Sequence, residues 1–201
     1  MRITFTLGLT AALLVCAGNA HAQGISVGVR AGVNVANLSF SSETEVTDSK
    51  NLTGFVAGVF VTVPVNGIVA FQPELLFSMQ GTKLTDGGDS AKIKLDYIQT
   101  PLLLHLKPGA KSPIAVLVGP TLGFKNSAKI EVPGAPVGSS DGFEDQIEGF
   151  DVGLVAGAAL ELGPFVVDGR YTWGLMNIAK DSSDPGTAKN RVFSATVGLR
   201  F

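Results

Sequence analysis

The chain has 201 residues, of which 45% are hydrophobic and 16% are charged, and its formal net charge is -2. This length fits one domain, and the composition is apolar for a soluble protein. A nearly neutral chain without a basic cluster offers no electrostatic attraction to nucleic acid, so we expect no nucleic-acid partner.

The first 22 residues have the features of a secretory signal peptide. Arg2 is their only charge, an apolar stretch runs from about Leu7 to Ala17, and residues 20–22 form an A-x-A cleavage site. The apolar stretch is too short to span a bilayer as a helix. We therefore expect residues 1–22 to be removed and residues 23–201 to form one exported domain, which lacks cysteine because Cys16 is the only one.

Residues 24–35 begin a series of segments in which apolar and polar residues alternate. The odd positions from Ile25 to Val35 are apolar, whereas the even positions include Arg30 and Asn34. A period of two predicts a β-strand with one apolar face and one polar face. The same pattern predicts further strands at residues 54–65, 68–81, 92–108, 114–124, 150–162, 165–176 and 190–201.

Two prolines disturb the alternation. Pro73 lies inside the third predicted strand, where it has no amide hydrogen to donate, so we expect a local break in the hydrogen-bond ladder. In the fourth predicted strand the alternation slips near Pro101, which we also interpret as a bulge.

The breaks between the predicted strands alternate in length. Those after the first, third, fifth and seventh strands are long and polar, and those after the second, fourth and sixth are short turns, such as the one at Asn66 and Gly67. An up-and-down barrel with its long loops at one end produces this alternation. We therefore predict an all-β fold, an eight-stranded antiparallel up-and-down transmembrane β-barrel.

Alternation alone does not show whether the apolar faces contact lipid or a core, because a soluble lipocalin-like carrier would alternate too. The polar strand positions are mostly Gly, Ser, Thr, Gln and Asn, whereas a soluble surface would carry many Lys and Glu. Strands of about 10 to 12 residues also suffice to cross an outer membrane. Aromatic residues toward the strand ends fit interfacial girdles, and they include Phe55, Phe71, Tyr171 and Trp173. We therefore expect the apolar faces to contact outer-membrane lipid.

Four segments and the C-terminus carry a resemblance to a known family. The segments are GVRAGVNVANLS, FQPELLFSMQG, LDYIQTPLLL and VGPTLGF, and the last strand ends in Phe201. From about Gly24 to Phe201 the chain resembles the porin-family outer-membrane β-barrel proteins labelled PorT-type, and the second and third segments are the more specific ones. The resemblance implies a barrel fold and a bacterial outer-membrane location, but little about mechanism, because members mostly lack an assigned activity.

The last predicted strand also resembles the signal by which the outer-membrane assembly machinery recognises its substrates. Its apolar face ends in an aromatic residue and consists of Phe193, Val197, Leu199 and Phe201. Such a strand could pair with an exposed edge of the machinery during biogenesis. Phe201 would equally serve as the last aromatic residue of a girdle, and both explanations stay open.

Charged residues on the polar faces of the strands would line the barrel lumen. They are Arg30, Glu74, Asp151, Glu161, Asp168, Arg170 and Arg200. Charges removed from water are tolerated when they pair, and eight strands leave an interior that side chains just fill. We therefore predict a plugging salt-bridge network, in which Glu74 pairs with Arg30 or Arg170; a narrow gated polar pathway is the alternative.

We expect no enzyme activity, no cofactor and no metal site. His105 is the only histidine of residues 23–201, and the topology places it at the periplasmic end of the fourth strand. The acids in the long loop at residues 125–149 lack the spacing of a calcium-binding loop. The predicted function is a structural or interaction role through long extracellular loops, with an unknown loop partner. A narrow porin-like channel for small solutes and a soluble exported lipocalin-like carrier are the alternatives.

Overall fold

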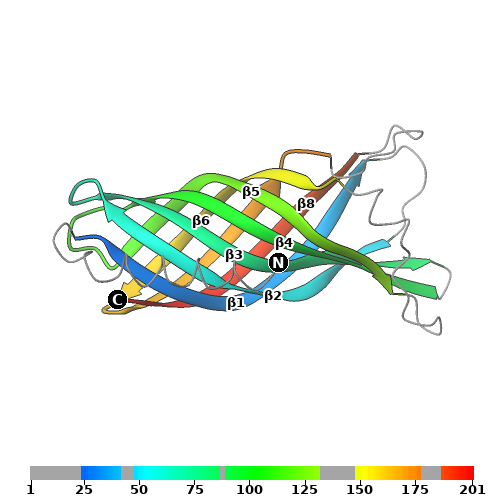
Figure 1. Ribbon diagram of the computed structural model, residues 1–201, viewed down its shortest axis with the longest axis horizontal. Helices are drawn as coiled ribbons and strands as arrows, with labels where there is room; N and C mark the ends of the chain where they lie inside the picture. The colour runs from blue at the N-terminus through cyan, green and yellow to red at the C-terminus, as the bar shows by residue number, and fades with distance from the viewer. Residues whose placement is uncertain (1–23, 42–47, 87–88, 132–147, 178–186) are drawn as a thin grey trace, which may run out of the picture.

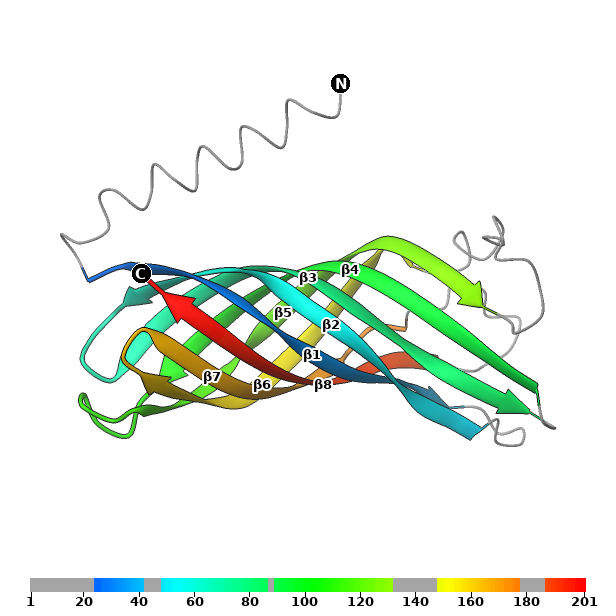
Figure 2. The same cartoon turned by 90° about the horizontal axis from the view of Figure 1, so that it is seen from below.

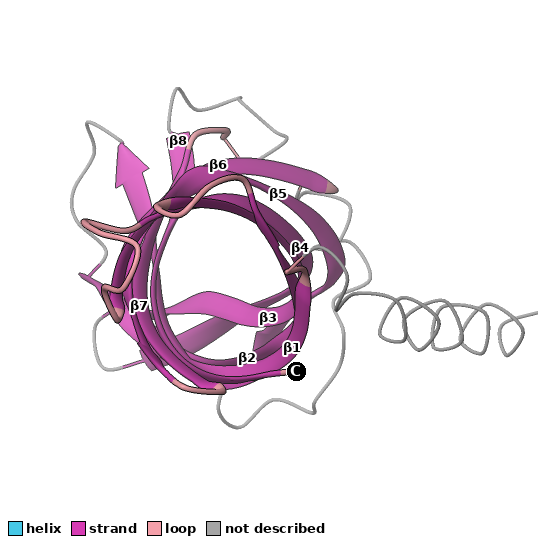
Figure 3. Cartoon of the chain, turned by 90° about the vertical axis from the view of Figure 1, so that its left-hand side faces the viewer, coloured by secondary structure: helices cyan, strands magenta, loops and turns pink. Residues whose placement is uncertain are grey.

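The structure is a computed structural model that describes residues 24–41, 48–86, 89–131, 148–177 and 187–201. All eight predicted strands are present, each is antiparallel to its neighbours, and β1 pairs with β8 to close the sheet (Figure 1). Figure 2 shows the strands running obliquely around the long axis, and Figure 3 shows the closed ring from one end. The predicted eight-stranded up-and-down barrel is therefore confirmed.

The strands differ considerably in length. They are β1 (Ser26–Ser41), β2 (Asp48–Pro64), β3 (Val69–Asp86), β4 (Asp89–Leu106), β5 (Ile114–Glu131), β6 (Phe150–Leu162), β7 (Phe165–Gly174) and β8 (Thr187–Arg200). We call the end with the connections 65–68, 107–113 and 163–164 the turn end, and the opposite end the loop end. β3, β4 and β5 have 18 residues each and β7 has 10, so one side of the wall extends further at the loop end.

Stretches expected to be loops are partly strand. The break expected after the third strand is almost absent, because β3 continues to Asp86 and β4 begins at Asp89. β1 and β5 likewise continue to Ser41 and Glu131. The predicted alternation of long and short loops is therefore wrong in detail. Alternation in polarity stops where both faces of a strand meet water, but backbone pairing can continue there.

Pro73 interrupts the ladder as predicted, whereas the slip predicted near Pro101 is wrong. Tyr97, Pro101 and Leu103 are all buried, so the same parity points inward along β4. The irregular register of β4 lies instead at Asp96 and Tyr97, against β5. The sequence pattern does not show this regularity, because Leu103 is apolar although it faces the lumen.

The outer face of the barrel is apolar, and the inner face carries polar and charged side chains among apolar ones. Every strand exposes large hydrophobic side chains, among them Val29, Phe55, Leu75, Leu104, Val116, Leu154, Val167 and Val197. The buried polar side chains include Asn34, Gln72, Glu74, Ser78, Asp168, Arg170, Asn190 and Thr196. A soluble carrier would need the opposite arrangement, so the expected lipid-facing orientation holds and the lipocalin-like alternative does not.

The four residues assigned to the aromatic girdles all lie on the outer face. The rings of Phe55 and Phe77 have centroids 5.6 Å apart, and those of Tyr171 and Trp173 have centroids 4.6 Å apart. Phe71 lies near the turn end, and it is exposed like Phe55 and Trp173. Their position at the membrane interfaces stays a prediction.

Several expectations fall on residues that the structure does not describe. The signal peptide at residues 1–22 and most of the acidic loop at residues 125–149 lie outside the described residues. In the part of the chain that is described, no helix is both long and apolar enough to cross a membrane.

Candidate functional site

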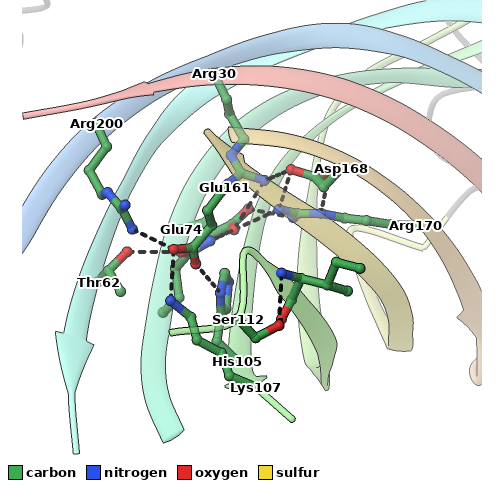
Figure 4. A network of polar contacts seen from close by, with 12 residues as sticks. Arg30, Thr62, Glu74, His105, Lys107, Ser112, Glu161, Asp168, Arg170 and Arg200 are labelled. Carbon is green, nitrogen blue, oxygen red and sulfur yellow. Dashed lines mark hydrogen bonds and ion pairs between the residues drawn. The ribbon is translucent and has the colours of Figure 1, made fainter. Parts of the chain in front are cut away.

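Four charged side chains from three strands meet inside the barrel. Arg30 comes from β1, Glu74 from β3, and Asp168 and Arg170 from β7 (Figure 4). All four lie on the inward parity of their strands, and none is more than 5% exposed. We call these four residues the central network.

Cations and carboxylates alternate in the central network. Arg170 donates from Nη1 to Glu74 Oε2 at 2.7 Å and from Nη2 to Glu74 Oε1 at 3.0 Å, which is a bidentate pair. Arg170 Nε also donates to Asp168 Oδ1 at 2.6 Å. Arg30 Nη1 donates to Asp168 Oδ2 at 2.9 Å and lies 3.4 Å from Glu74 Oε1. Glu74 therefore contacts both of the arginines expected as alternative partners, and the four formal charges cancel.

Neutral side chains extend the central network to neighbouring strands. Gln72 Nε2 donates to Glu74 Oε1 at 2.6 Å, and Thr62 Oγ1 of β2 donates to Gln72 Oε1 at 2.9 Å. Thr196 Oγ1 of β8 donates to Asp168 Oδ2 at 2.9 Å. The buried carboxylates thus receive hydrogen bonds as well as ion pairs, which buried charges require.

Phe60 is a member of this site that the sequence pattern missed. The guanidinium carbon of Arg30 lies 4.5 Å from the centroid of the Phe60 ring, within cation–π range. Arg30 Nε and Nη2 make no hydrogen bond to any described residue, so the ring covers part of that cation. Gly28 makes room for the ring, because a Cβ there would lie 2.2 Å from Phe60 Cζ. The available signal was an aromatic residue on the face of β2 that also carries Gly54, Gly58 and Thr62.

A second charged group lies at the turn end of the lumen. Glu161 Oε2 accepts hydrogen bonds from Lys107 Nζ at 2.8 Å and from Arg200 Nη1 at 3.3 Å. His105 Nδ1 lies 3.8 Å from Glu161 Oε1. The side chains of Lys107 and Arg200 are 23% and 26% exposed, and all three of Lys107, Glu161 and Arg200 line a cavity of about 330 Å³. We call His105, Lys107, Glu161 and Arg200 the mouth network.

Asp151 belongs to a third group, toward the loop end. Asn190 Nδ2 donates to Asp151 Oδ2 at 2.8 Å and lies 3.5 Å from the hydroxyl oxygen of Tyr97. The seven charged residues expected to line the lumen therefore do so, but they form three groups instead of one network. The sequence pattern did not assign Lys107 to the lumen. Lys107 directly follows β4 and has the same inward parity as His105.

An apolar cluster lines one side of the lumen next to the central network and the mouth network. Leu117, Ala159 and Val166 form a buried cluster, with 0%, 3% and 3% exposure. In the strand register Ala159 is aligned with Asp168, and Val166 is aligned with Glu161. The cluster lies on the neighbouring strands β5, β6 and β7, so it extends from the height of the central network to that of the mouth network on one side of the lumen.

The residues of the expected C-terminal assembly signal share the outer face of β8. Phe193, Val197 and Phe201 are exposed, and Leu199 has the same parity. The amide nitrogen of Phe201 donates to the carbonyl oxygen of Val27 at 2.7 Å, so the last strand is paired to its end. Recognition of this strand during assembly stays a prediction.

The described residues include no group of three or more His, Cys, Asp or Glu that could hold a metal ion. The arrangement instead offers cross-strand ion pairs that fix the position of buried charges. Its direct consequence is structural, since the central network links β1, β3 and β7 across the lumen.

Comparison with known proteins places this geometry in a family. Residues 19–180 match the model of the outer membrane protein beta-barrel domain. No curated protein is similar enough to the chain to count as a match.

Solved structures of barrel proteins are also similar. Ail, the attachment invasion locus protein of Yersinia pestis, is 13% identical with a TM-score of 0.49, and the match covers 88% of this chain and 98% of that one. OprG from Pseudomonas aeruginosa is 12% identical with a TM-score of 0.47, over 88% and 95% of the two chains. Neisserial surface protein A is 16% identical with a TM-score of 0.45, over 89% and 97%. Because the family match covers more than half of this chain, the chain belongs to the outer membrane protein beta-barrel domain family and is a bacterial outer-membrane barrel.

Proposed function

We propose that this protein is a closed scaffold that holds strand ends and connecting segments outside the cell as an interaction surface. In outer-membrane barrels the short turns face the periplasm and the longer connections face the exterior. The turn end is then periplasmic and the loop end extracellular. The strands β3, β4 and β5, which are the longest, carry the wall outward at that end.

The observation that carries this proposal is the filled lumen. The central network spans it from β1 to β3 and β7, and the apolar cluster of Leu117, Ala159 and Val166 packs on one side of the lumen from this height toward the turn end. A solute that passed along the axis would have to displace these paired charges. A narrow porin-like channel is the second candidate, because polar side chains such as Asn34 and Asn190 line the lumen above the central network.

Catalysis is not part of the proposal. His105 is 3% exposed and lies beside Glu161 and Lys107 at the turn end, where an outer-leaflet substrate does not reach it. The resemblance to PorT-type proteins fits this view, because it implies a fold and a location without an activity.

Single-channel recording in planar bilayers tests whether the lumen is closed. The purified protein should give no conductance steps above background at neutral pH, because the charges of the central network pair with each other. A porin with a known step size, added to the same bilayer, is the positive control. Reproducible steps from this protein would contradict the closed scaffold and favour the channel.

Loop replacement tests the interaction surface. Residues 132–147, between β5 and β6, would be replaced by a short Gly-Ser linker that leaves both strands intact. We expect the barrel to keep its heat-dependent gel mobility, while bacteria that carry the variant attach less well to surfaces than bacteria with the natural chain. Unchanged attachment would remove this segment from the proposed surface.

We also propose that the assembly machinery reads the last strand, which is supported by the exposed outer face that ends in Phe201. Phe201→Ala should lower the amount of folded protein in the outer membrane. Phe165→Ala is the matched control, because Phe165 is 54% exposed at the same end of the neighbouring strand β7. Equal losses from both variants would favour the girdle explanation for Phe201.

A further inference from the structure

Three prolines lie side by side on three adjacent strands. In the strand register, Pro73 of β3 is aligned with Leu102 of β4, which directly follows Pro101. Pro101 is aligned with Thr121 of β5, which directly follows Pro120. We call Pro73, Pro101 and Pro120 the proline row.

Pairing between strands is interrupted at each member of the proline row. A proline has no amide hydrogen, so it cannot donate to the ladder. The register is the same on both sides of each gap, so the strands stay aligned and only the pairing is lost. The missing pairs are Val61/Pro73 and Thr62/Gln72 between β2 and β3, Glu74/Pro101 and Leu75/Thr100 between β3 and β4, and Leu102/Pro120 and Leu103/Gly119 between β4 and β5.

The wall on the other side of Pro120 is continuous. Every residue of β5 from Ile114 to Phe124 is paired with β6, and Pro120 itself is aligned with Leu154 there. Pairing between β6 and β7 has no gap from Gly153 to Leu162. Backbone groups without a partner are costly in hydrocarbon, so three neighbouring gaps make the wall from β2 to β5 weaker than the wall from β5 to β7.

Side chains on the inner face bridge the gaps. Thr62 and Gln72 lie opposite each other in the gap between β2 and β3. Their backbones are not paired there, but Thr62 Oγ1 donates a hydrogen bond of 2.9 Å to Gln72 Oε1. Gln72 in turn donates to Glu74, which lies opposite Pro101. Glu74 is held by Arg170 of β7 and lies 3.4 Å from Arg30 of β1. The weak wall is therefore tied to the opposite wall through one carboxylate.

We propose that the proline row is a lateral seam, through which the lumen can open toward the membrane hydrocarbon, and that Glu74 holds this seam shut. Leu103 lies in the gap between β4 and β5, and its side chain is fully buried on the lumen side. Leu117, also fully buried, lies two residues before Gly119 of the same gap. The inner face behind the gap between β4 and β5 is thus apolar, whereas Thr62, Gln72 and Glu74 lie behind the other two gaps. The ligand that fits the apolar part is a small apolar molecule dissolved in the membrane, such as an acyl chain.

Two buried positions allow a direct comparison of the two walls. Leu103 is 0% exposed behind the seam, and Val155 is 2% exposed behind the continuous wall. Val155 is aligned with Gly119 of β5 and with Thr172 of β7, without a gap on either side. Leu103→Cys and Val155→Cys would each be made in the chain of residues 23–201, which contains no other cysteine.

The probe is pyrene maleimide, which dissolves in the bilayer of lipid vesicles that contain the folded protein. When Glu74→Gln is added, the cysteine at position 103 should react about tenfold faster with this probe, which corresponds to about 1.4 kcal/mol of easier opening. The cysteine at position 155 should react at an unchanged rate. A charged, water-soluble thiol reagent should show no acceleration at either position.

Three results would overturn the proposal. Equal acceleration at positions 103 and 155 would mean general loosening of the barrel, and no acceleration at position 103 would mean that Glu74 does not hold the wall. Faster reaction with the water-soluble reagent would indicate an axial path, which conductance recording would also detect. A seam that opens without conductance leaves the proposed closed scaffold intact.

A second pair of substitutions keeps the proposal testable if Glu74→Gln does not fold. Pro73→Val and Pro120→Val restore two amide donors at positions whose side chains point outward, while Glu74 is retained. These changes should slow the reaction of the cysteine at position 103 with pyrene maleimide. An unchanged rate would show that the prolines do not determine access to the lumen.

Discussion

The central network and the mouth network use the same kinds of side chain in different surroundings. In the central network every member is at most 5% exposed, and two cations face two carboxylates in close pairs. In the mouth network one carboxylate, Glu161, forms ion pairs with both Lys107 and Arg200, whose side chains are about a quarter exposed. A buried charge must find all of its partners within the protein, whereas a partly exposed charge also interacts with water. The same chemistry is therefore expected to have very different energetic importance at the two places.

Removal of Glu74 is the sharpest test of this difference. Glu74→Ala leaves two buried arginines with a single carboxylate, and a broken buried pair costs about 3–5 kcal/mol. We expect a loss of this size in the free energy of unfolding, measured by guanidinium titration of the protein in lipid vesicles. A loss below about 1 kcal/mol, typical of exposed pairs, would show that water reaches the central network freely.

The contact between Arg30 and Phe60 should have an intermediate effect. A cation over an aromatic ring, away from water, contributes about 1–2 kcal/mol. A double-mutant cycle with Arg30→Met and Phe60→Leu should therefore give a coupling energy of this size, because the cycle removes the separate cost of unpaired carboxylates and lost packing. Additive effects of the two substitutions would show that the ring only fills space.

The smallest effect is expected in the mouth network. Glu161→Gln removes a carboxylate whose cations are partly exposed, so the free energy of unfolding should fall by less than about 1 kcal/mol. This difference should shrink further when the salt concentration rises, because salt screens exposed charges. Glu74→Ala, measured in the same salt series, is the control that should change little. A large, salt-independent loss at Glu161 would remove the distinction between the two networks.

The barrel could be predicted from the sequence because a strand between lipid and a polar lumen has two chemically different faces. The alternation in residues 24–35 and 150–162 is regular for this reason, and it placed all seven charged residues on the correct face. Where strands leave the membrane the alternation ends, and β3 and β5 are longer than the pattern indicates.

The grouping of the charges could not be predicted from the alternation. Parity tells which face a residue occupies, but its height in the lumen depends on strand register and on irregularities such as the one at Asp96 and Tyr97. These heights place Glu161 and Arg200 together at the mouth, away from Arg170. Phe60 and Leu103 were missed because a filled lumen also contains apolar side chains.

The orientation of the two faces is the central claim, and Trp173 allows its most direct test. Trp173 is the only tryptophan of the chain, and it is 40% exposed on the outer face of β7. The measurement is fluorescence quenching of the protein in vesicles, with bromine on the lipid acyl chains or with iodide in the water. Strong quenching by brominated lipid and weak quenching by iodide are the expected result. Strong quenching by iodide with none by brominated lipid would contradict the lipid-facing outer wall.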